Sequence, residues 1–373
     1  MVKKIVCVVG TRPEGIKMAP LIHALRRKRF AVTVLSTGQH LHMLHQALHF
    51  FDIRADVNLS IMEKQQTLDG ITVKVLKGVG DFLDRHPQDL ALVHGDTTTT
   101  MASALAAFYR RIPVGHVEAG LRSGDMSSPF PEEANRALTD RLASLWFAPT
   151  ERAAANLRGE GLPVTGNTMS VTGNTVIDAL KIALAKKHDL CEELAGLQSF
   201  TGPLILMTSH RRESWGEPLE SICGAVTDIL NRNDEVRVLI PLHKNPSVRG
   251  VIKRHLGENE RVILSEPLDY PDFVWAMKRS SLILSDSGGV QEESAELKVP
   301  LLVMRSTSER PEALEAGTAT LVGTERSTIA DTAFRILIDE AFRNSFLNRG
   351  ANPFGSGDAS ERISDMILKF FSL

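Results

Sequence analysis

Short apolar runs alternate along the chain with segments of helical length and helical patterning. In the first half, the apolar runs are residues 5–9, 31–35, 90–93, 113–117 and 145–147. Short, largely apolar runs of this kind are typical of parallel strands that are buried on both faces. Helix-length segments lie between them, at residues 19–27, 98–109 and 131–144. The first half therefore predicts repeated βαβ units in a doubly wound α/β fold.

A second series of the same kind begins after residues 171–178. Its apolar runs are residues 204–207, 236–240, 262–264, 282–284, 301–304 and 320–322. Two consecutive series within 373 residues predict two Rossmann-like α/β domains that face each other across a cleft. We place the first domain at residues 1–172 and the second at 173–358, followed by an amphipathic helix within 359–373.

Composition and charge exclude several classes of protein. The 43 basic and 45 acidic residues give a net charge of −2, without the basic patch that nucleic-acid binding needs. Three cysteines without CxxC spacing provide neither a disulfide framework nor a zinc site. No apolar stretch approaches the roughly 20 residues of a membrane helix, and the N-terminus has no cleavage site. We therefore expect a cytosolic protein that does not bind membranes.

The segment after the first predicted strand has the features of an anion site. In open α/β sheets, ligands bind beyond the carboxyl ends of the strands. Gly10 permits a tight turn there, and Pro13 suits the first turn of a helix. The helix N-terminus, with Arg12 and Lys17 nearby, could bind a diphosphate. A plain turn with surface cations is the alternative.

Carboxylates follow two further strands of the first half. Asp96 comes after the run 90–93, and Glu118 comes after the run 113–117. Glu132 and Glu133 lie at the start of the predicted helix 131–144. Asp96 could instead cap the next helix, and the helix dipole alone would explain one or both glutamates. The placement nevertheless indicates acid/base chemistry at the strand ends.

The second half places cationic and glycine-rich segments at its strand ends. Histidines follow two strands, in His210-Arg-Arg-Glu213 and His243-Lys-Asn-Pro246, which suggests a negatively charged ligand. Asp286-Ser-Gly-Gly-Val-Gln-Glu-Glu293 resembles a phosphate-binding turn whose Glu292 or Glu293 could accept from ribose hydroxyls. Metal-ligand spacing, a Walker lysine and a nucleophile elbow are all absent from the sequence. These patterns favour a nucleotide-sugar or nucleotide-phosphate enzyme without a built-in metal.

The motifs, in this order, resemble those of the non-hydrolysing UDP-N-acetylglucosamine 2-epimerase family. They run over essentially the whole chain, as Gly10-Thr-Arg-Pro-Glu14, His94-Gly-Asp-Thr97, residues 115–136, Gly173-Asn-Thr-Val-Ile-Asp178, His210–Glu213, Asp286–Glu293, Glu309-Arg-Pro-Glu312 and Asn352-Pro-Phe-Gly-Ser-Gly357. The resemblance implies the two-domain GT-B fold, with UDP bound by the second domain. It also implies that the C-terminal helix crosses back onto the first domain. The segment 294–298 departs from the family pattern.

The same resemblance assigns the site residues. It implies acid/base catalysis by Asp96, Glu118, Glu132 and His210. It implies substrate binding by Arg12, Lys17, Arg136, His243, Phe273, Ser287, Gly288, Gly289, Glu293 and Arg310. A second, allosteric substrate pocket would involve Gln39, His40, Arg211 and His243. No cofactor and no metal are implied, and the family partner is a second copy of the chain, as a homodimer.

We expect weak substrate activation. Leu41 and Gln65 stand where some relatives carry arginine, and losing an arginine–phosphate contact weakens binding by roughly ten- to a hundredfold.

The implied reaction is the reversible epimerisation of UDP-N-acetylglucosamine at C2, which supplies activated N-acetylmannosamine for bacterial surface polysaccharide. UDP leaves to give a 2-acetamidoglucal and then adds back, so two acid/base groups on opposite faces are needed. The alternatives are a hydrolysing 2-epimerase, an epimerase for a related UDP-2-acetamido sugar, a GT-B glycosyltransferase and a nucleotide-sugar sensor without catalysis. Three carboxylates from one domain favour the epimerase.

Overall fold

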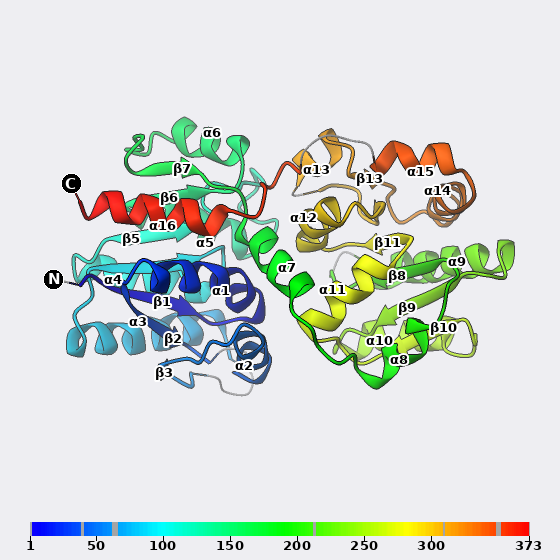
Figure 1. The fold of residues 1–373 in the computed structure, drawn as a ribbon, viewed down its shortest axis with the longest axis horizontal. Helices are drawn as coiled ribbons and strands as arrows, with labels where there is room; N and C mark the ends of the chain where they lie inside the picture. Colours follow the sequence, from blue (N-terminus) through cyan, green and yellow to red (C-terminus); the bar gives the residue numbers. More distant parts are fainter. Residues whose placement is uncertain are drawn as a thin grey trace. The chain divides into compact units, whose positions relative to one another are not determined.

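The computed structural model describes residues 2–38, 41–61, 66–211, 214–308, 310–347 and 352–372. The chain divides into two compact units, of which unit 1 contains residues 1–181 and 354–373 and unit 2 contains residues 182–353 (Figure 1). The domain boundaries expected from the sequence, after residues 172 and 358, lie nine and five residues from these divisions. The first division falls inside a helix, α7, whose continuous pattern gave no sign of a boundary.

Unit 1 is built on a parallel sheet with the strand order β3-β2-β1-β4-β5-β6-β7. The strands are β1 (Lys4–Val9), β2 (Ala31–Ser36), β3 (Val57–Asn58), β4 (Leu90–His94), β5 (Val114–Val117), β6 (Leu145–Ala148) and β7 (Met169–Val171). The helices are α1 (Arg12–Arg27), α2 (Leu41–Phe50), α3 (Leu68–Arg85), α4 (Thr98–Tyr109), α5 (Glu132–Leu142), α6 (Glu151–Gly159), α7 (Thr175–Ala185) and α16 (Ala359–Phe370). The short edge strands β3 and β7 were not predicted, because two or three residues cannot form a recognisable apolar run.

Unit 2 repeats this arrangement, with the strand order β10-β9-β8-β11-β12-β13. Its strands are β8 (Leu204–Thr208), β9 (Arg237–Pro241), β10 (Val262–Ser265), β11 (Leu282–Ser285), β12 (Leu301–Val303) and β13 (Ala319–Leu321). Its helices are α8 (Glu192–Gln198), α9 (Glu217–Arg232), α10 (Pro246–Leu256), α11 (Tyr270–Arg279), α12 (Gly288–Leu297), α13 (Pro311–Glu315), α14 (Arg326–Ile338) and α15 (Glu340–Leu347). The prediction of two doubly wound parallel α/β units is confirmed.

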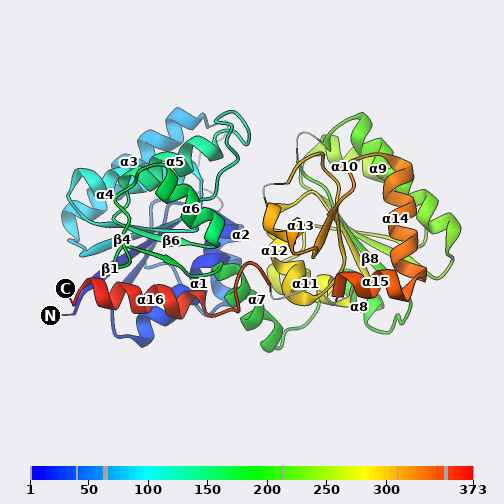
Figure 2. The ribbon, with the colours of Figure 1, turned by 90° about the horizontal axis from the view of Figure 1, so that it is seen from above.

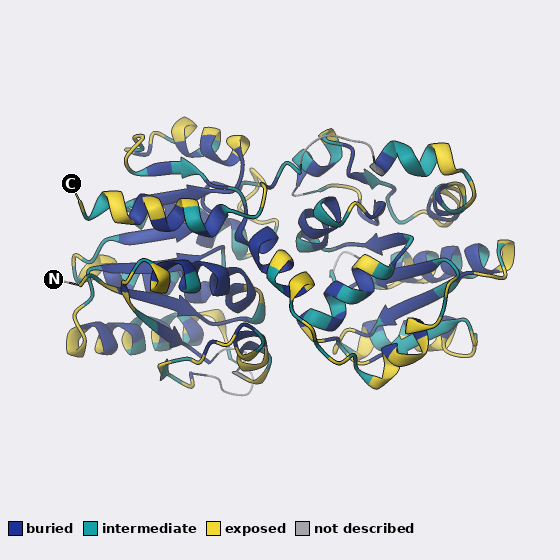
Figure 3. Cartoon of the chain, in the orientation of Figure 1, coloured by how far each residue is buried: buried dark blue, intermediate teal, exposed yellow. Residues whose placement is uncertain are grey.

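Helices cover both faces of the unit 1 sheet, which explains why its strands are apolar. α3 and α4 lie over one face, and α1 and α16 lie over the other (Figure 2). Val6 and Val93 on neighbouring strands belong to one buried cluster with Phe82 of α3. Buried residues accordingly follow the strands, while exposed residues follow the outer helix surfaces (Figure 3). Each strand then ends at an edge where polar loops can gather.

The C-terminal helix α16 belongs to unit 1 and packs against α1. Ile363 and Ile367 are fully buried. The first turn of α16 is capped by Asp178, whose carboxylate accepts from the backbone N–H groups of Ala359 at 3.2 Å and Ser360 at 2.8 Å. The last residues of the chain therefore contribute to the core of the first unit.

Candidate active site

Both sheets reverse their strand order beside their first strand, between β1 and β4 in unit 1 and between β8 and β11 in unit 2. Ligands of open α/β sheets bind at such points, beyond the carboxyl ends of the strands. In unit 1, Asp96 follows β4 and Glu118 follows β5. In unit 2, His210 follows β8 and Asp286 follows β11. Each unit therefore presents a polar cluster at the edge where its topology predicts a site.

The Glu118 carboxylate is surrounded by side chains from several elements and is 6% exposed. Its Oε2 accepts from the Lys17 ammonium and, at 2.9 Å, from Asn174 Nδ2. Arg136 Nη2 lies 3.8 Å from Oε1, and His94 Nε2 lies 3.7 Å from Oε2. Burial lowers the pKa of His94 to about 4, so its imidazole is neutral at neutral pH. Two cationic side chains and an amide donor thus surround this carboxylate.

The backbone at Glu118 is in the left-handed region. Its φ is +66°, which is uncommon for a residue with a Cβ. Gly120 follows with φ +82°, and a Cβ there would lie 2.3 Å from the carbonyl oxygen of Ala153. Strained backbone of this kind concentrates at functional sites. The turn after β5 therefore sets the direction of the Glu118 side chain and requires a glycine two residues later.

Asp96 and Glu118 share one arginine. The Arg136 guanidinium pairs with Asp96 Oδ2, and the Asn135 amide donates to the Asp96 carbonyl oxygen at 3.0 Å. Glu132 is half-buried at the first residue of α5, and its spacing from Arg136 puts the two residues on the same helix face. The structure thus brings two predicted acid/base residues to one guanidinium, and places the third on the helix that supplies it.

Glu14 connects the loops after β1 and β4. Its carboxylate accepts from the backbone N–H groups of Gly10 at 2.5 Å and Thr11 at 2.9 Å, and from the Thr97 hydroxyl at 2.5 Å. Burial raises the pKa of Glu14, while these hydrogen bonds oppose the shift. The residue therefore has a structural role: it fixes the N-terminus of α1 beside the loop that carries Asp96.

His116 supports the same loops from inside the sheet. The ring is fully buried, with Nδ1 2.6 Å from Asp140 Oδ1 and Nε2 2.8 Å from the carbonyl oxygen of Gly95. Asp140 also pairs with Arg122 at 2.7 Å and accepts from the Gly120 N–H at 3.2 Å. This network ties together the backbone segments beside both predicted carboxylates.

In unit 2, Asp286 organises the loop that carries His210. Its carboxylate accepts from the backbone N–H groups of His210 and Arg211, at 2.9 and 3.0 Å, and from the hydroxyls of Ser209 and Ser214, both at 3.1 Å. Burial opposes ionisation, but the His210 imidazole and these N–H groups together lower the pKa of Asp286 to about 2. His210 Nδ1 lies 3.1 Å from Oδ1, which leaves Nε2 available to a ligand.

A second imidazole lies next to His210. The ring centroids of His210 and His243 are 6.1 Å apart. Burial and the neighbouring His210 lower the pKa of His243. Its Nδ1 accepts from the Asn245 N–H at 3.3 Å, so the Nε2 atom carries the proton and is a donor for an anionic group.

The N-terminus of α12 has the geometry of an anion site. Ser287 is the N-cap, and Gly288 and Gly289 form the first helical positions. A Cβ at Gly289 would meet no atom within 4 Å. Packing inside the protein therefore does not explain this glycine, whereas close approach of a ligand to the helix N–H groups would.

Further predicted residues lie on or near α12. Glu292 forms a buried ion pair with Arg310 at 2.5 Å. Glu293 accepts from the Tyr270 hydroxyl at 2.8 Å. Phe273 is half-buried on α11, three residues after Tyr270. Of the two glutamates proposed to accept from ribose hydroxyls, Glu292 is thus committed to an arginine.

Several buried residues of the two clusters were not predicted as site residues, among them His94, Asn174 and Asp286. Asp286 directly follows a strand, so the strand-end rule could have found it. His94 is the last residue of β4, directly after the apolar run 90–93, and Asn174 precedes a helix. Only the tertiary structure brings these two residues to Glu118.

The predicted allosteric residues are only partly described. Gln39 and His40 lie outside the described residues, as do Gln65 and the side chain of Leu41. Arg211 is described, and its backbone N–H donates to Asp286. The expected weak substrate activation therefore stays a prediction.

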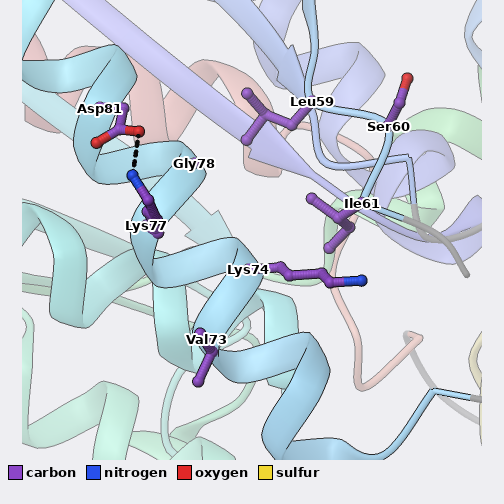
Figure 4. A pocket seen from close by; sticks show the side chains of 8 residues that line it. All are labelled: Leu59, Ser60, Ile61, Val73, Lys74, Lys77, Gly78 and Asp81. Carbon is purple, nitrogen blue, oxygen red and sulfur yellow. Dashed lines mark hydrogen bonds and ion pairs between the residues drawn. The ribbon is translucent and has the colours of Figure 1, made fainter.

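Two pockets are lined by other residues. A pocket of about 330 Å³ lies between α3 and the segment after β3, where Lys77 pairs with Asp81 at 3.0 Å (Figure 4). A pocket of about 630 Å³ in unit 2 is lined by residues of α11 and the end of α7, among them Trp275. The described residues that line these pockets include none of the predicted site residues.

The described ranges contain neither a candidate metal cluster nor a candidate membrane-spanning helix. Within them, no group of three or more His, Cys, Asp and Glu side chains is placed to hold a metal ion. No helix formed by these residues combines the length and apolarity needed to span a membrane.

Comparisons with known proteins agree on one family. Residues 23–368 match the family described as UDP-N-acetylglucosamine 2-epimerase. The UDP-N-acetylglucosamine 2-epimerase of Escherichia coli K12 is 48% identical, over 98% of each chain. The UDP-GlcNAc 2-epimerase of Neisseria meningitidis, solved bound to UDP-GlcNAc, is 42% identical with a TM-score of 0.90, over 98% of this chain and 100% of that one. The S. aureus MnaA–UDP co-structure is 44% identical with a TM-score of 0.91, over 100% and 98%.

Proposed function

This chain belongs to the UDP-N-acetylglucosamine 2-epimerase family, and we propose that it interconverts UDP-N-acetylglucosamine and UDP-N-acetylmannosamine by inverting C2 of the sugar. The observation that carries the proposal is the pair of carboxylates, Asp96 and Glu118, that share Arg136 at adjacent strand ends. A protein that only binds a nucleotide sugar would not need this pair. We also propose that the product supplies activated N-acetylmannosamine for the synthesis of surface polysaccharide.

The proposed reaction has two steps. A carboxylate takes the proton from C2 while the C1–O bond breaks, so that its electron pair leaves with UDP and a C1–C2 double bond forms. In the second step, an acid on the opposite face returns a proton to C2 and a UDP oxygen bonds to C1. Each positioned acid or base contributes about 10²–10⁴-fold. Asp96, Glu118 and Glu132 supply these groups.

The polar cluster of unit 2 is proposed to bind UDP. The N-terminus of α12 offers N–H groups to the diphosphate, and His243 offers the N–H at its Nε2. The ring of His210 lies beside His243, with its Nδ1 turned to Asp286. Charge develops on the diphosphate as the C1–O bond breaks, so fixed donors there stabilise the transition state. Asp286 holds the His210 ring in position throughout.

Proton NMR in D2O tests the proposed reaction. We expect deuterium at C2 of both UDP-N-acetylglucosamine and UDP-N-acetylmannosamine when the protein is incubated with either one, without added metal or nicotinamide. Turnover without exchange at C2 would refute the mechanism. Release of UDP with free N-acetylmannosamine would indicate the hydrolysing reaction, and no change in either sugar would leave a transferase or a binding protein.

The proposal also includes a homodimer. Apolar side chains are exposed on α3 and α4, where Val73, Phe108 and Tyr109 are 63%, 53% and 65% exposed. Side chains of this kind are enriched in interfaces between copies of a chain. Light scattering after gel filtration should give a mass of twice the chain mass of 40.9 kDa. The double substitution Phe108→Ser and Tyr109→Ser should shift the measured mass towards that of one chain.

A further inference from the structure

Asn174 is a buried residue at the start of α7 that makes contacts in three directions. Its side chain is 2% exposed. Its Oδ1 accepts from the Val176 N–H at 3.0 Å and so caps α7. Its Nδ2 donates to Glu118 Oε2 at 2.9 Å. Its backbone N–H donates to the carbonyl oxygen of Phe354 at 2.7 Å.

The third contact joins the two segments at which the chain leaves unit 1 and returns to it. Gly173 has φ +83°, and a Cβ there would lie 3.0 Å from the Phe354 carbonyl oxygen and 3.2 Å from Gly355 Cα. Lys181 also reaches across, to the carbonyl oxygen of Ser356. These two crossing segments, residues 173–181 and 354–356, are therefore held in close contact, and Asn174 lies in the first of them.

Glu118 needs more than a charge partner to keep one direction. Lys17 supplies charge through a flexible four-carbon stem, and Arg136 is shared with Asp96. Asn174, by contrast, is fixed at both ends, because its backbone is bonded to the return segment and its Oδ1 to α7. Two further hydrogen bonds therefore fix the amide that donates to the carboxylate.

We propose that Asn174 is a positioning residue for Glu118, and that it links the direction of this carboxylate to the crossing segments of the chain. The proposal rests on the proposed function, since Glu118 is taken to be an acid/base group of that reaction. Asn174 itself touches no reacting atom. Its amide holds Glu118 Oε2 so that the carboxylate meets C2 in one orientation.

Asn174→Asp and Asn174→Ser test the proposal. Both keep an oxygen that can cap α7, but aspartate lacks the N–H donor and serine is too short to reach Glu118. We expect kcat to fall by about ten- to a hundredfold in both, with KM and the UDP affinity within about twofold of wild type. Thermal unfolding and titration with UDP show whether each variant is folded.

The pH profile separates positioning from a general structural role. In Asn174→Asp, a protonated carboxyl could again donate to Glu118, so kcat should recover partly as the pH falls. Lys17 from α1, His94 from β4 and Arg136 from α5 also face Glu118, but they are unchanged between wild type and variant. Asn174→Ser has no such donor to regain and should show no recovery.

Lys181→Met is the matched control, because it removes another tie between the same segments without contacting Glu118. It should keep kcat within about twofold. Wild-type kcat in both Asn174 variants would overturn the proposal, as would equal losses in Lys181→Met. If the Asn174 variants neither fold nor bind UDP, Asn174 has a purely structural role. Wild-type protein without C2 exchange would instead refute the proposed function.

Discussion

At the scale of single residues, the two polar clusters differ in what holds their central carboxylate. The Glu118 carboxylate accepts from two side chains, the Lys17 ammonium and the Asn174 amide, with the Arg136 guanidinium 3.8 Å away. Asp286 is held by backbone N–H groups, hydroxyls and an imidazole, which together keep it ionised. The first arrangement suits a group that exchanges protons, and the second suits a group that orients a neighbour.

The acid/base residues can be tested by amide substitutions. Asp96→Asn, Glu118→Gln and Glu132→Gln keep the shape of each side chain but cannot transfer a proton. We expect each to lower kcat by about 10²–10⁴-fold, with UDP affinity unchanged because UDP is proposed to bind unit 2. Steady-state rates give kcat, and calorimetric titrations give the affinity for UDP. Glu151→Gln, at an exposed position in α6, is the control; near-normal rates in all three variants would contradict the assignment.

Asp286 should make the folded state sensitive to acid. Its pKa is lowered to about 2 in the folded protein, below its ordinary value of 3.8, so its stabilisation is present above about pH 4 and is lost as the pH falls towards 2. Linkage puts the loss at about 2 kcal/mol. Urea unfolding of wild type and Asp286→Asn across this range should show the steeper decline in wild type. Parallel declines would mean that Asp286 is not the group responsible.

At the scale of elements, the strand-to-helix connection is the unit from which the site is built. β1 leads through Gly10 into α1, and β11 leads through Ser287 into α12. Each connection turns the chain at the carboxyl edge of a sheet and places a helix N-terminus there. The helix then stabilises anions through its free N–H groups and dipole.

Gly289→Ala should separate stability from binding. No atom lies within 4 Å of the added Cβ, and alanine is the better helix former, so the unfolding free energy should stay equal or rise by up to about 1 kcal/mol. The same methyl group would obstruct an anion at the N-terminus of α12, so UDP affinity should fall at least tenfold. Denaturant unfolding and UDP titration provide the two values. Unchanged UDP affinity would exclude this helix from the proposed site.

At the scale of the whole molecule, the chain closes its first unit only with its last helix. Ile363→Ala in α16 removes a fully buried side chain, and we expect it to lower the unfolding free energy of unit 1 by about 2–4 kcal/mol. Leu368→Ala on the same helix, 45% exposed, should change it by less than about 0.5 kcal/mol. Hydrogen exchange resolves the units, and equal effects of both substitutions would contradict the packing of α16.

Local patterning along the chain was sufficient to predict the main strands and helices and the polar residues at their ends. Apolar runs such as 90–93 and 282–284 form buried strands, because a strand that is covered by helices on both faces carries apolar side chains on both. The prediction that Asp96, Glu118 and His210 follow strand ends is confirmed as a placement: Asp96 and Glu118 follow neighbouring strands of the unit 1 sheet, and His210 follows β8 of the unit 2 sheet. Their catalytic roles stay predictions.

Which side chains come into contact depends on the three-dimensional arrangement of the elements. The contact between Asn174 and Glu118 joins residues 56 positions apart, and the Asp286 network joins a loop to a strand end 76 positions away. Neither can be read from periodicity, because a side chain's partners depend on which strands become neighbours and how each loop turns. The left-handed backbone at Glu118 could not be predicted either. Packing of the surrounding loops imposes this conformation, and glutamate has no local preference for it.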